Sequence, residues 1–225
     1  EYILEATNIV KKFPGVIALK GVDLKVKKGE ILGLVGENGA GKSTLMKCII
    51  GIHPPTSGEI KFDGNPLGKF STSDALSMGI SYIQQELSPI EYRPIMENIW
   101  VGREPKNKFG LVDHKQMFID TKELLSQIGM DEDPKMLVKE LTVAKQQMIE
   151  IAKAVSYDAK LIIMDEPTSA LSGSEISELF SIMRKLKQEG KSIIYISHKL
   201  DEIYTITDRV TILRDGEFIG SEMID

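Results

Sequence analysis

The sequence has very little of what disulfide-rich, nucleic-acid-binding or membrane-spanning proteins need. Its 225 residues include a single cysteine, Cys48, so an internal disulfide is excluded and a reducing compartment is expected. The formal net charge is -5, whereas domains that bind phosphate backbones usually carry a basic surplus, so nucleic acid is not expected as the main partner. Apolar runs such as 161–164 are far too short to span a bilayer, so a role at a membrane would require another subunit to hold the protein there.

The remaining composition is that of one folded globular domain. Hydrophobic residues make up 42% and charged residues 27%, and a chain of 225 residues can bury a substantial core. Residues 1–5 lack the charged-then-apolar layout of a signal peptide, so none is expected in that segment. We therefore treat residues 1–225 as a single domain.

Short apolar segments separated by turn residues predict an α/β fold. Residues 1–30 alternate apolar and polar side chains around Pro14-Gly15 and Lys28-Gly29, which predicts an antiparallel β lobe. Further strands are expected at 31–35, 58–62, 79–83, 161–164, 192–197, 209–213 and 217–220, and helices at 44–50, 175–188 and 199–206. Because strands and helices alternate in the last third, the core sheet should be mainly parallel with right-handed crossovers.

The middle of the chain, about 86–158, has helical periodicity and predicts an inserted helical subdomain. Asp113 and Gln116 have the spacing of a capping box, so one helix should begin after Asp113 and run to Gly129. A second helix should begin near Thr142.

One glycine-rich segment fits the phosphate-binding pattern G-x-x-x-x-G-K-[ST] in full. It reads Gly36-Glu37-Asn38-Gly39-Ala40-Gly41-Lys42-Ser43-Thr44 and lies between an apolar strand and a helix, as the mechanism requires. The glycines let backbone N–H groups turn toward phosphates, and the helix N-terminus adds partial positive charge. Lys42 would reach the β- and γ-phosphates of ATP, and Ser43 would bind Mg²⁺. The alternative is a strand-to-helix turn without a ligand.

Two carboxylates, Asp165 and Glu166, end the apolar strand 161–164. The carboxyl ends of parallel strands face the ligand crevice, so both should lie near the phosphates. Asp165 would hold Mg²⁺, directly or through water, and Glu166 would polarise the attacking water. Strands often end in polar residues, so this pair gains its meaning from the phosphate loop in the same chain.

With these two motifs in place, the whole chain resembles the ABC transporter ATPase family, whose fold is a P-loop NTPase core. Residues 167–172, Pro-Thr-Ser-Ala-Leu-Ser, are similar to the family's D-loop. Ile196-Ser197-His198 is similar to its switch histidine, which contacts the γ-phosphate and orders the catalytic water. Taken alone, a histidine after a strand is more often a surface or core residue. The other two histidines, His53 and His114, are assigned no chemistry.

Two further nucleotide contacts are implied by the resemblance. Ile83-Gln84-Gln85-Glu86 resembles the Q-loop, and similarity to importers that read Gln-Glu-Leu here makes Gln85 the Mg²⁺ ligand and Gln84 its neighbour. Phe13 matches the aromatic residue that stacks on adenine, although an aromatic before a turn is commonly a packing residue.

Three longer segments resemble the monosaccharide importers of the galactose/methyl-galactoside and ribose type; they are residues 96–103, 146–154 and 196–199. In that group two ATPase domains usually follow each other in one polypeptide, and this chain is similar to the first. The resemblance implies membrane-spanning permease subunits and a second ABC ATPase domain as partners, and indirectly a sugar-binding protein. It implies a peripheral position on the cytoplasmic face of the membrane.

The family signature Leu-Ser-Gly-Gly-Gln is altered here to Leu141-Thr142-Val143-Ala144-Lys145. Thr142 keeps a hydroxyl at the helix N-cap, but Ala144 adds a methyl group where backbone should approach phosphate, and Lys145 adds a charge that could compensate. Because each signature acts on the ATP held by the other domain, the site that borrows this one would be slower. The alternative is that this group tolerates a loose signature without penalty.

Two other functional classes remain open from the sequence. A non-transport ABC ATPase, such as a translation factor or a DNA-repair protein, would more often have a basic surface or a coiled-coil insertion. A regulatory nucleotide-binding module is favoured by the altered signature, but Glu166 and His198 argue against it.

Overall fold

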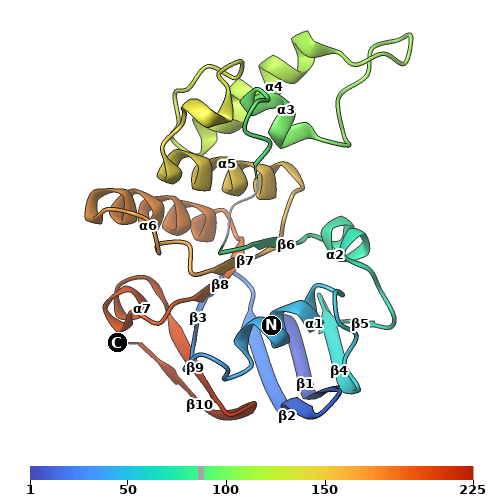
Figure 1. Cartoon of the computed structure of the whole chain (residues 1–225), viewed down its shortest axis with the longest axis vertical. Coiled ribbons are helices and arrows are strands. Elements are labelled where there is room, and N and C mark those ends of the chain that lie inside the picture. Colours follow the sequence, from blue (N-terminus) through green and yellow to red (C-terminus); the bar gives the residue numbers. More distant parts are fainter. Residues whose placement is uncertain (86–88, 225) are drawn as a thin grey trace. The chain divides into compact units, whose positions relative to one another are not determined.

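The computed structural model describes residues 1–85 and 89–224 (Figure 1). Its elements in chain order are β1 (Tyr2–Phe13), β2 (Val16–Lys27), β3 (Ile31–Val35), α1 (Lys42–Ile49), β4 (Ser57–Phe62), β5 (Asn65–Leu67), α2 (Thr72–Met78), β6 (Ile80–Ile83), α3 (Ile95–Trp100), α4 (His114–Gln127), η1 (Val138–Glu140), α5 (Val143–Ser156), β7 (Leu161–Asp165), α6 (Gly173–Gln188), β8 (Ser192–Ile196), α7 (Leu200–Ile206), β9 (Arg209–Arg214) and β10 (Glu217–Met223). The chain forms two compact units: unit 1 is Glu1–Gln85, Ala159–Pro167 and Met183–Asp225, and unit 2 is Glu86–Asp158 and Thr168–Ile182.

The first sheet of unit 1 is antiparallel, with strand order β2-β1-β4-β5. The predicted turn at Pro14-Gly15 joins β1 to β2, so the antiparallel lobe expected from residues 1–30 is confirmed. Asp63 and Gly64 both have positive φ, 49° and 77°, as a tight two-residue hairpin requires, and they join β4 to β5.

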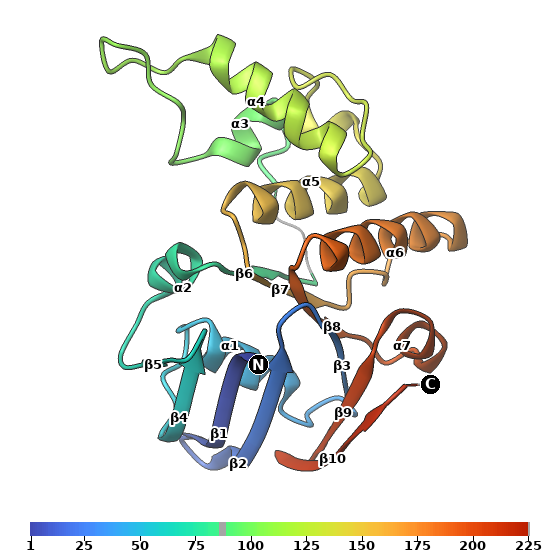
Figure 2. The same cartoon turned by 180° about the vertical axis from the view of Figure 1, so that it is seen from behind.

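The second sheet of unit 1 has the order β10-β9-β3-β8-β7-β6, and only β10 is antiparallel to its neighbour (Figure 2). Strands β7 and β8 are buried along their whole length, which explains why their sequences are nearly all apolar. Leu34 of β3 and Asp165 of β7 both pair with Ile196 of β8. The loops that follow these three strands therefore leave the sheet at one edge, and the predicted mainly parallel sheet is confirmed.

One hydrophobic core holds unit 1 together. Side chains from both sheets pack with Leu45, Met46 and Ile49 of α1, all of which are fully buried. Burying each such side chain stabilises the fold by about 1.5–3 kcal/mol. The helix that follows the phosphate loop is thus anchored on one face by the core.

Unit 2 contains α3, α4 and α5, so the helical character predicted for the middle of the chain is confirmed. Thr121 of α4 is buried and accepts a hydrogen bond from the Trp100 indole at 3.0 Å. The Arg103 guanidinium stacks 3.4 Å from the centre of the Tyr157 ring. Unit 2 also includes Thr168–Ile182, which the sequence pattern did not indicate.

The two predicted helix starts in unit 2 had different outcomes. Thr142 caps α5, where its hydroxyl accepts from the backbone of Lys145 at 3.3 Å. Asp113 caps α4, but Gln116 donates to Asp120 at 2.6 Å instead of reaching back, so the reciprocal capping box expected there is wrong. Four short elements, β5, α2, α3 and η1, were not individually predicted, because their few residues give no clear periodicity. Within the described residues, none of the helices is apolar over a length that would cross a membrane.

Candidate nucleotide-binding site

Two of the three glycines in the loop between β3 and α1 lie where a side chain would not fit. A Cβ on Gly36 would lie 2.4 Å from the carbonyl oxygen of Leu213 in β9. Gly41 has a φ of 100°, and a Cβ there would lie 2.8 Å from the Leu19 side chain. The loop is therefore pressed against the backbone of unit 1, with the N-terminus of α1 at its end.

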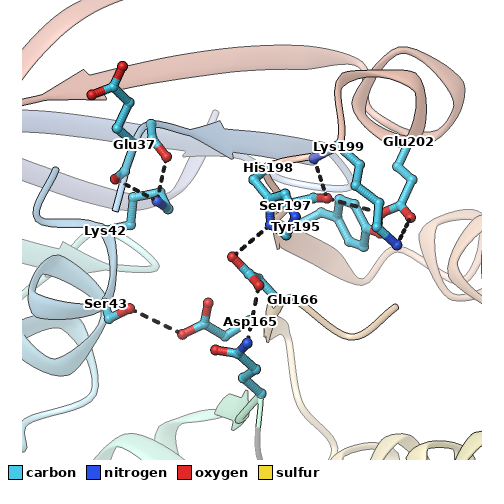
Figure 3. A network of polar contacts seen from close by, with 12 residues as sticks. Glu37, Lys42, Ser43, Asp165, Glu166, Tyr195, Ser197, His198, Lys199 and Glu202 are labelled. Atoms are coloured by element: carbon cyan, nitrogen blue, oxygen red, sulfur yellow. Dashed lines mark hydrogen bonds and ion pairs between the residues drawn. The ribbon is translucent and has the colours of Figure 1, made fainter. Parts of the chain in front are cut away.

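Lys42 is buried and folds back over this loop (Figure 3). Its ammonium group donates to the carbonyl oxygens of Gly36 at 2.6 Å and of Glu37 at 3.1 Å. The neighbouring Ser43 hydroxyl lies 3.4 Å from Oδ2 of Asp165. A fixed cation inside the loop can exchange these carbonyl contacts for charge-assisted hydrogen bonds to phosphate oxygens.

A cavity of about 200 Å³ opens beside the loop. It is lined by residues 38–44 together with Ala18, Gln85, Asp165 and Glu166. Of the two candidate glutamines, Gln85 lines this cavity; Glu86, the last residue of the Q-loop pattern, lies outside the described residues. Ala18 comes from the β1–β2 hairpin region, and sequence reasoning missed it.

Asp165 ends β7 as a buried carboxylate with a partner that sequence reasoning also missed. The hydroxyl of Tyr82 in β6 donates to Asp165 Oδ2 at 2.7 Å. Burial, and then the adjacent Asp165 carboxylate, raise the pKa of Tyr82 above its usual range, so the phenol stays a donor. A phenol in an otherwise mostly apolar strand was the available signal, because a buried tyrosine hydroxyl needs a partner.

Glu166 occupies a strained backbone position directly after β7. Its φ is 47°, in the left-handed region that costs roughly 1 kcal/mol for a residue with a side chain. Its N–H donates to the carbonyl oxygen of Ile196 at 2.9 Å, which fixes the turn. The carboxylate accepts from Gln85 Nε2 at 3.2 Å and lies 3.1 Å from His198 Nδ1.

His198 follows β8 and presents its ring to this carboxylate (Figure 3). The side chain is 60% exposed, so much of the imidazole remains accessible to a ligand. The fold thus gathers six predicted residues at the carboxyl edge of one parallel sheet: Lys42, Ser43, Gln85, Asp165, Glu166 and His198.

Phe13 lies at the end of β1 and packs against other side chains. The His53 ring meets it edge-on, with 5.4 Å between ring centres, and the Lys11 ammonium lies 5.1 Å from its centre. In the described part of the chain, Phe13 is not among the residues that line the 200 Å³ cavity. Its stacking on adenine stays a prediction.

The altered signature, 141–145, lies at the start of α5 in unit 2. Ala144 is only 6% exposed. Obstruction of phosphate approach by its methyl group stays a prediction. The Lys145 ammonium pairs with Glu132 at 2.5 Å, and this contact raises the pKa of Lys145. Leu141 is also buried, whereas Val143 is half-exposed.

The donors beside the phosphate loop fit a magnesium ion. Within residues 1–85 and 89–224 no group of three or more His, Cys, Asp or Glu residues gathers as a metal cluster. Ser43, Gln85 and Asp165, which all line the cavity, instead offer a hydroxyl, an amide and a carboxylate. Mg²⁺ prefers this kind of set, with few protein oxygens and the remaining positions filled by phosphate and water.

Comparison with known proteins identifies the family. The family model described as ABC transporter matches residues 19–169, which is more than half of the chain. The chain belongs to the ABC transporter family. Solved ABC cassettes have the same fold: a nucleotide-free ATP-binding cassette from an ABC transporter superposes with a TM-score of 0.90 at 24% identity, covering 100% of this chain and 92% of that one. The ADP conformation of MJ1267, an ATP-binding cassette, gives a TM-score of 0.89 at 25% identity, covering 99% and 91%.

Curated relatives within the family are import proteins. The galactose/methyl galactoside import ATP-binding protein MglA of Clostridium tetani is 55% identical over 97% of this chain and 44% of its own length. A protein of the same name from Photobacterium profundum, MglA 1, is 53% identical over 98% and 44%. The putative ribose/galactose/methyl galactoside import ATP-binding protein 2 of Burkholderia lata is 50% identical over 97% and 42%. The chain therefore spans less than half the length of these relatives.

Proposed function

We propose that this chain is the ATP-binding and ATP-hydrolysing domain of a bacterial ABC importer for a monosaccharide of the galactose, methyl-galactoside or ribose class. The observation that carries the ATPase proposal is the position of Glu166, held between Gln85 and His198 at the edge of the phosphate-loop cavity. The names of the 50–55% identical relatives support the import of these sugars.

Each residue around the cavity has a separate role in the proposed transfer of the γ-phosphoryl group to water. Backbone N–H groups of residues 39–43 and the Lys42 ammonium bind the β- and γ-phosphates. Ser43, Gln85 and Asp165 hold Mg²⁺, which when bound neutralises phosphate charge. Glu166 orients the water and accepts its proton as the water oxygen bonds to the γ-phosphorus and the bond to ADP breaks. His198 contacts the γ-phosphate and keeps Glu166 in place.

The proposed partners follow from the incomplete ATP sites of a single ABC domain, which has a phosphate loop for one ATP and a signature for another. A second ABC ATPase domain supplies the signature that closes this ATP site, and residues 141–145 close the other. Membrane-spanning permease subunits receive the motion, and a sugar-binding protein delivers the sugar to them. The domain then sits as a peripheral protein on the cytoplasmic face of the cell membrane.

Two substitutions test the ATPase proposal. Lys42→Ala should weaken binding of a fluorescent ATP analogue about tenfold or more, because charge-assisted hydrogen bonds are lost. Glu166→Gln should keep that binding and reduce phosphate release from ATP about 10²- to 10⁴-fold, because water loses its proton acceptor. Hydrolysis by Glu166→Gln at the unsubstituted rate would contradict the proposal.

The altered signature gives a second prediction, that the two sites are unequal. Because Lys145 is neutralised by Glu132, it cannot offer a free charge to phosphate without first breaking that ion pair. In the full-length protein, Glu166→Gln should remove most ATPase activity, whereas the equivalent change in the partner domain should remove little. Equal losses would favour the alternative that the loose signature carries no penalty.

Co-isolation of binding partners distinguishes a transport function from the other functions of ABC ATPases. Purified protein should co-isolate with a two-subunit membrane complex and energise uptake of galactose or ribose into vesicles that contain it. Co-isolation with ribosomes instead would point to a translation factor and overturn the import proposal.

A further inference from the structure

The loop that carries His198 is followed by a buried carboxylate, which the proposed mechanism does not use. Glu202 is in the first turn of α7 and is only 7% exposed. A buried carboxylate is costly unless several partners satisfy it, so its position requires an explanation.

The side chains that contact the Glu202 carboxylate belong to residues 195, 197 and 199, which lie at every second position on either side of His198. Its Oε2 accepts from the Tyr195 hydroxyl at 2.6 Å and from the Ser197 hydroxyl at 3.0 Å. Its Oε1 lies 3.1 Å from the Lys199 ammonium. Residues 195, 197 and 199 are thus tied to one carboxylate, and His198 lies between two of them (Figure 3).

The same contacts fix the backbone of the loop. The Ser197 hydroxyl also accepts from the Lys199 N–H at 3.1 Å, so it bridges across His198. The Glu202 N–H donates to the Lys199 carbonyl oxygen at 3.1 Å, where α7 begins. Because Tyr195 is fully buried in β8, this network connects the rigid sheet to the helix on both sides of the histidine.

His198 depends on that backbone for its direction. Its side chain is 60% exposed, so packing covers too little of the ring to hold it 3.1 Å from Glu166. We propose that Glu202 is a positioning residue for His198: with Tyr195 and Ser197 it fixes the loop so that the imidazole faces Glu166 and the γ-phosphate. This inference rests on the proposed ATPase function.

Glu202→Gln tests the inference with little change in shape. It should leave binding of the fluorescent ATP analogue within about twofold of the unsubstituted protein. It should lower kcat for ATP hydrolysis between about tenfold and a hundredfold, because small displacements of a catalytic group cost that much. Asp201→Asn is the matched control: it removes an exposed acidic charge from the same helical turn and should change neither quantity.

A spectroscopic measurement separates positioning from general destabilisation. The chain has three histidines, so its imidazole C–H signals can be assigned with single His→Gln variants. Glu202→Gln should shift the His198 signals and leave those of His53 and His114 unchanged. Tyr195→Phe, which keeps the buried ring and removes one hydroxyl, should shift the same signals in a folded protein even where Glu202→Gln unfolds.

A double-substitution cycle decides whether Glu202 acts through His198. In the His198→Ala background, Glu202→Gln should change kcat by less than about twofold, because the group it positions is gone. Unchanged His198 signals in Glu202→Gln, or a loss of kcat that is as large without His198 as with it, would overturn the inference. Failure of the unsubstituted protein to hydrolyse ATP would instead overturn the proposed function, and the imidazole signals would still report on the network.

Discussion

At the scale of single residues, the chemistry depends on side chains held in conformations or surroundings that their types do not favour. Glu166 is in the left-handed region, Lys42 is buried with its ammonium on backbone carbonyls, and Tyr82 is held as a donor to Asp165. Each is stabilised by hydrogen bonds from neighbouring strands or loops. Strain and buried charge at one sheet edge are typical of functional sites.

Cys48 shows the opposite case, a reactive group that its surroundings make inert. It is fully buried in α1, and burial raises the pKa of its thiol to about 11 from a usual 9.0. The fraction of thiolate near neutral pH therefore falls about a hundredfold, and a thiol reagent should label the native protein at least that much more slowly than the unfolded protein. Absorbance of released thionitrobenzoate measures both rates, and equally fast labelling of the native protein would show that Cys48 is accessible.

At the scale of elements, helix starts are fixed by a few side-chain-to-backbone contacts. In α2 the Ser71 hydroxyl accepts from the Asp74 N–H, and the Asp74 carboxylate accepts from the Ser71 N–H, which forms a reciprocal capping box. In α4 only one of the two hydrogen bonds is present: the Asp113 carboxylate accepts from the Gln116 N–H. The same spacing therefore produces a complete cap in one helix and half a cap in the other.

The cap of α2 gives a stability prediction. Ser71→Ala should lower the free energy of unfolding by about 0.5–2 kcal/mol, because the Asp74 N–H loses its acceptor. Thr72→Ala, one residue further along the same helix, is the matched control and should change it by less than about 0.5 kcal/mol. Urea denaturation measures both, and equal effects would contradict the assignment of the cap.

The same cap has a defined pH dependence. Hydrogen bonds from the Ser71 backbone and hydroxyl lower the pKa of Asp74 below its usual 3.8. A lowered folded-state pKa means that this contribution is complete above pH 3.8 and is lost as the pH falls through the folded value. The difference in unfolding midpoint between the unsubstituted protein and Ser71→Ala should therefore shrink in strong acid.

At the scale of the molecule, one buried ion pair links the two sheets of unit 1. Arg209 of β9 donates through Nε and Nη2 to both Glu30 oxygens, at 2.7 and 3.0 Å. It also donates to the Lys25 carbonyl oxygen in β2 and to the Ser221 hydroxyl in β10. Both charged side chains are largely buried, so this bidentate pair fixes the approach of the strands.

Arg209→Met should lower the free energy of unfolding by about 3–5 kcal/mol, because Glu30 is left as an uncompensated buried charge. The double variant Arg209→Met with Glu30→Gln should recover a large part of that loss, because the buried charge is removed as well. Urea denaturation followed by circular dichroism gives the three values. A double variant that loses the sum of both single effects would contradict a direct pairing.

Local patterns in the sequence were sufficient for most of the longer elements and for the motifs that they carry. The phosphate loop, the apolar strands β7 and β8 and the Pro14-Gly15 hairpin each depend on neighbouring residues, whose backbone preferences and hydrophobic period are visible in the chain. Because strands and helices alternate, the sequence also predicted a parallel sheet. The carboxyl ends of its strands bring residues 165, 166 and 198 to the same edge. The family also followed from these motifs and is confirmed.

Only the tertiary structure decided which side chains meet. Tyr82 on Asp165, Glu202 on Tyr195 and the edge-on contact of Phe13 with His53 are contacts that sequence reasoning did not identify. The burial of Ala144 and the pairing of Lys145 with Glu132 depend on how α5 packs within unit 2. Such contacts depend on the register of strands and the rotation of helices, which long-range packing sets and local propensity does not.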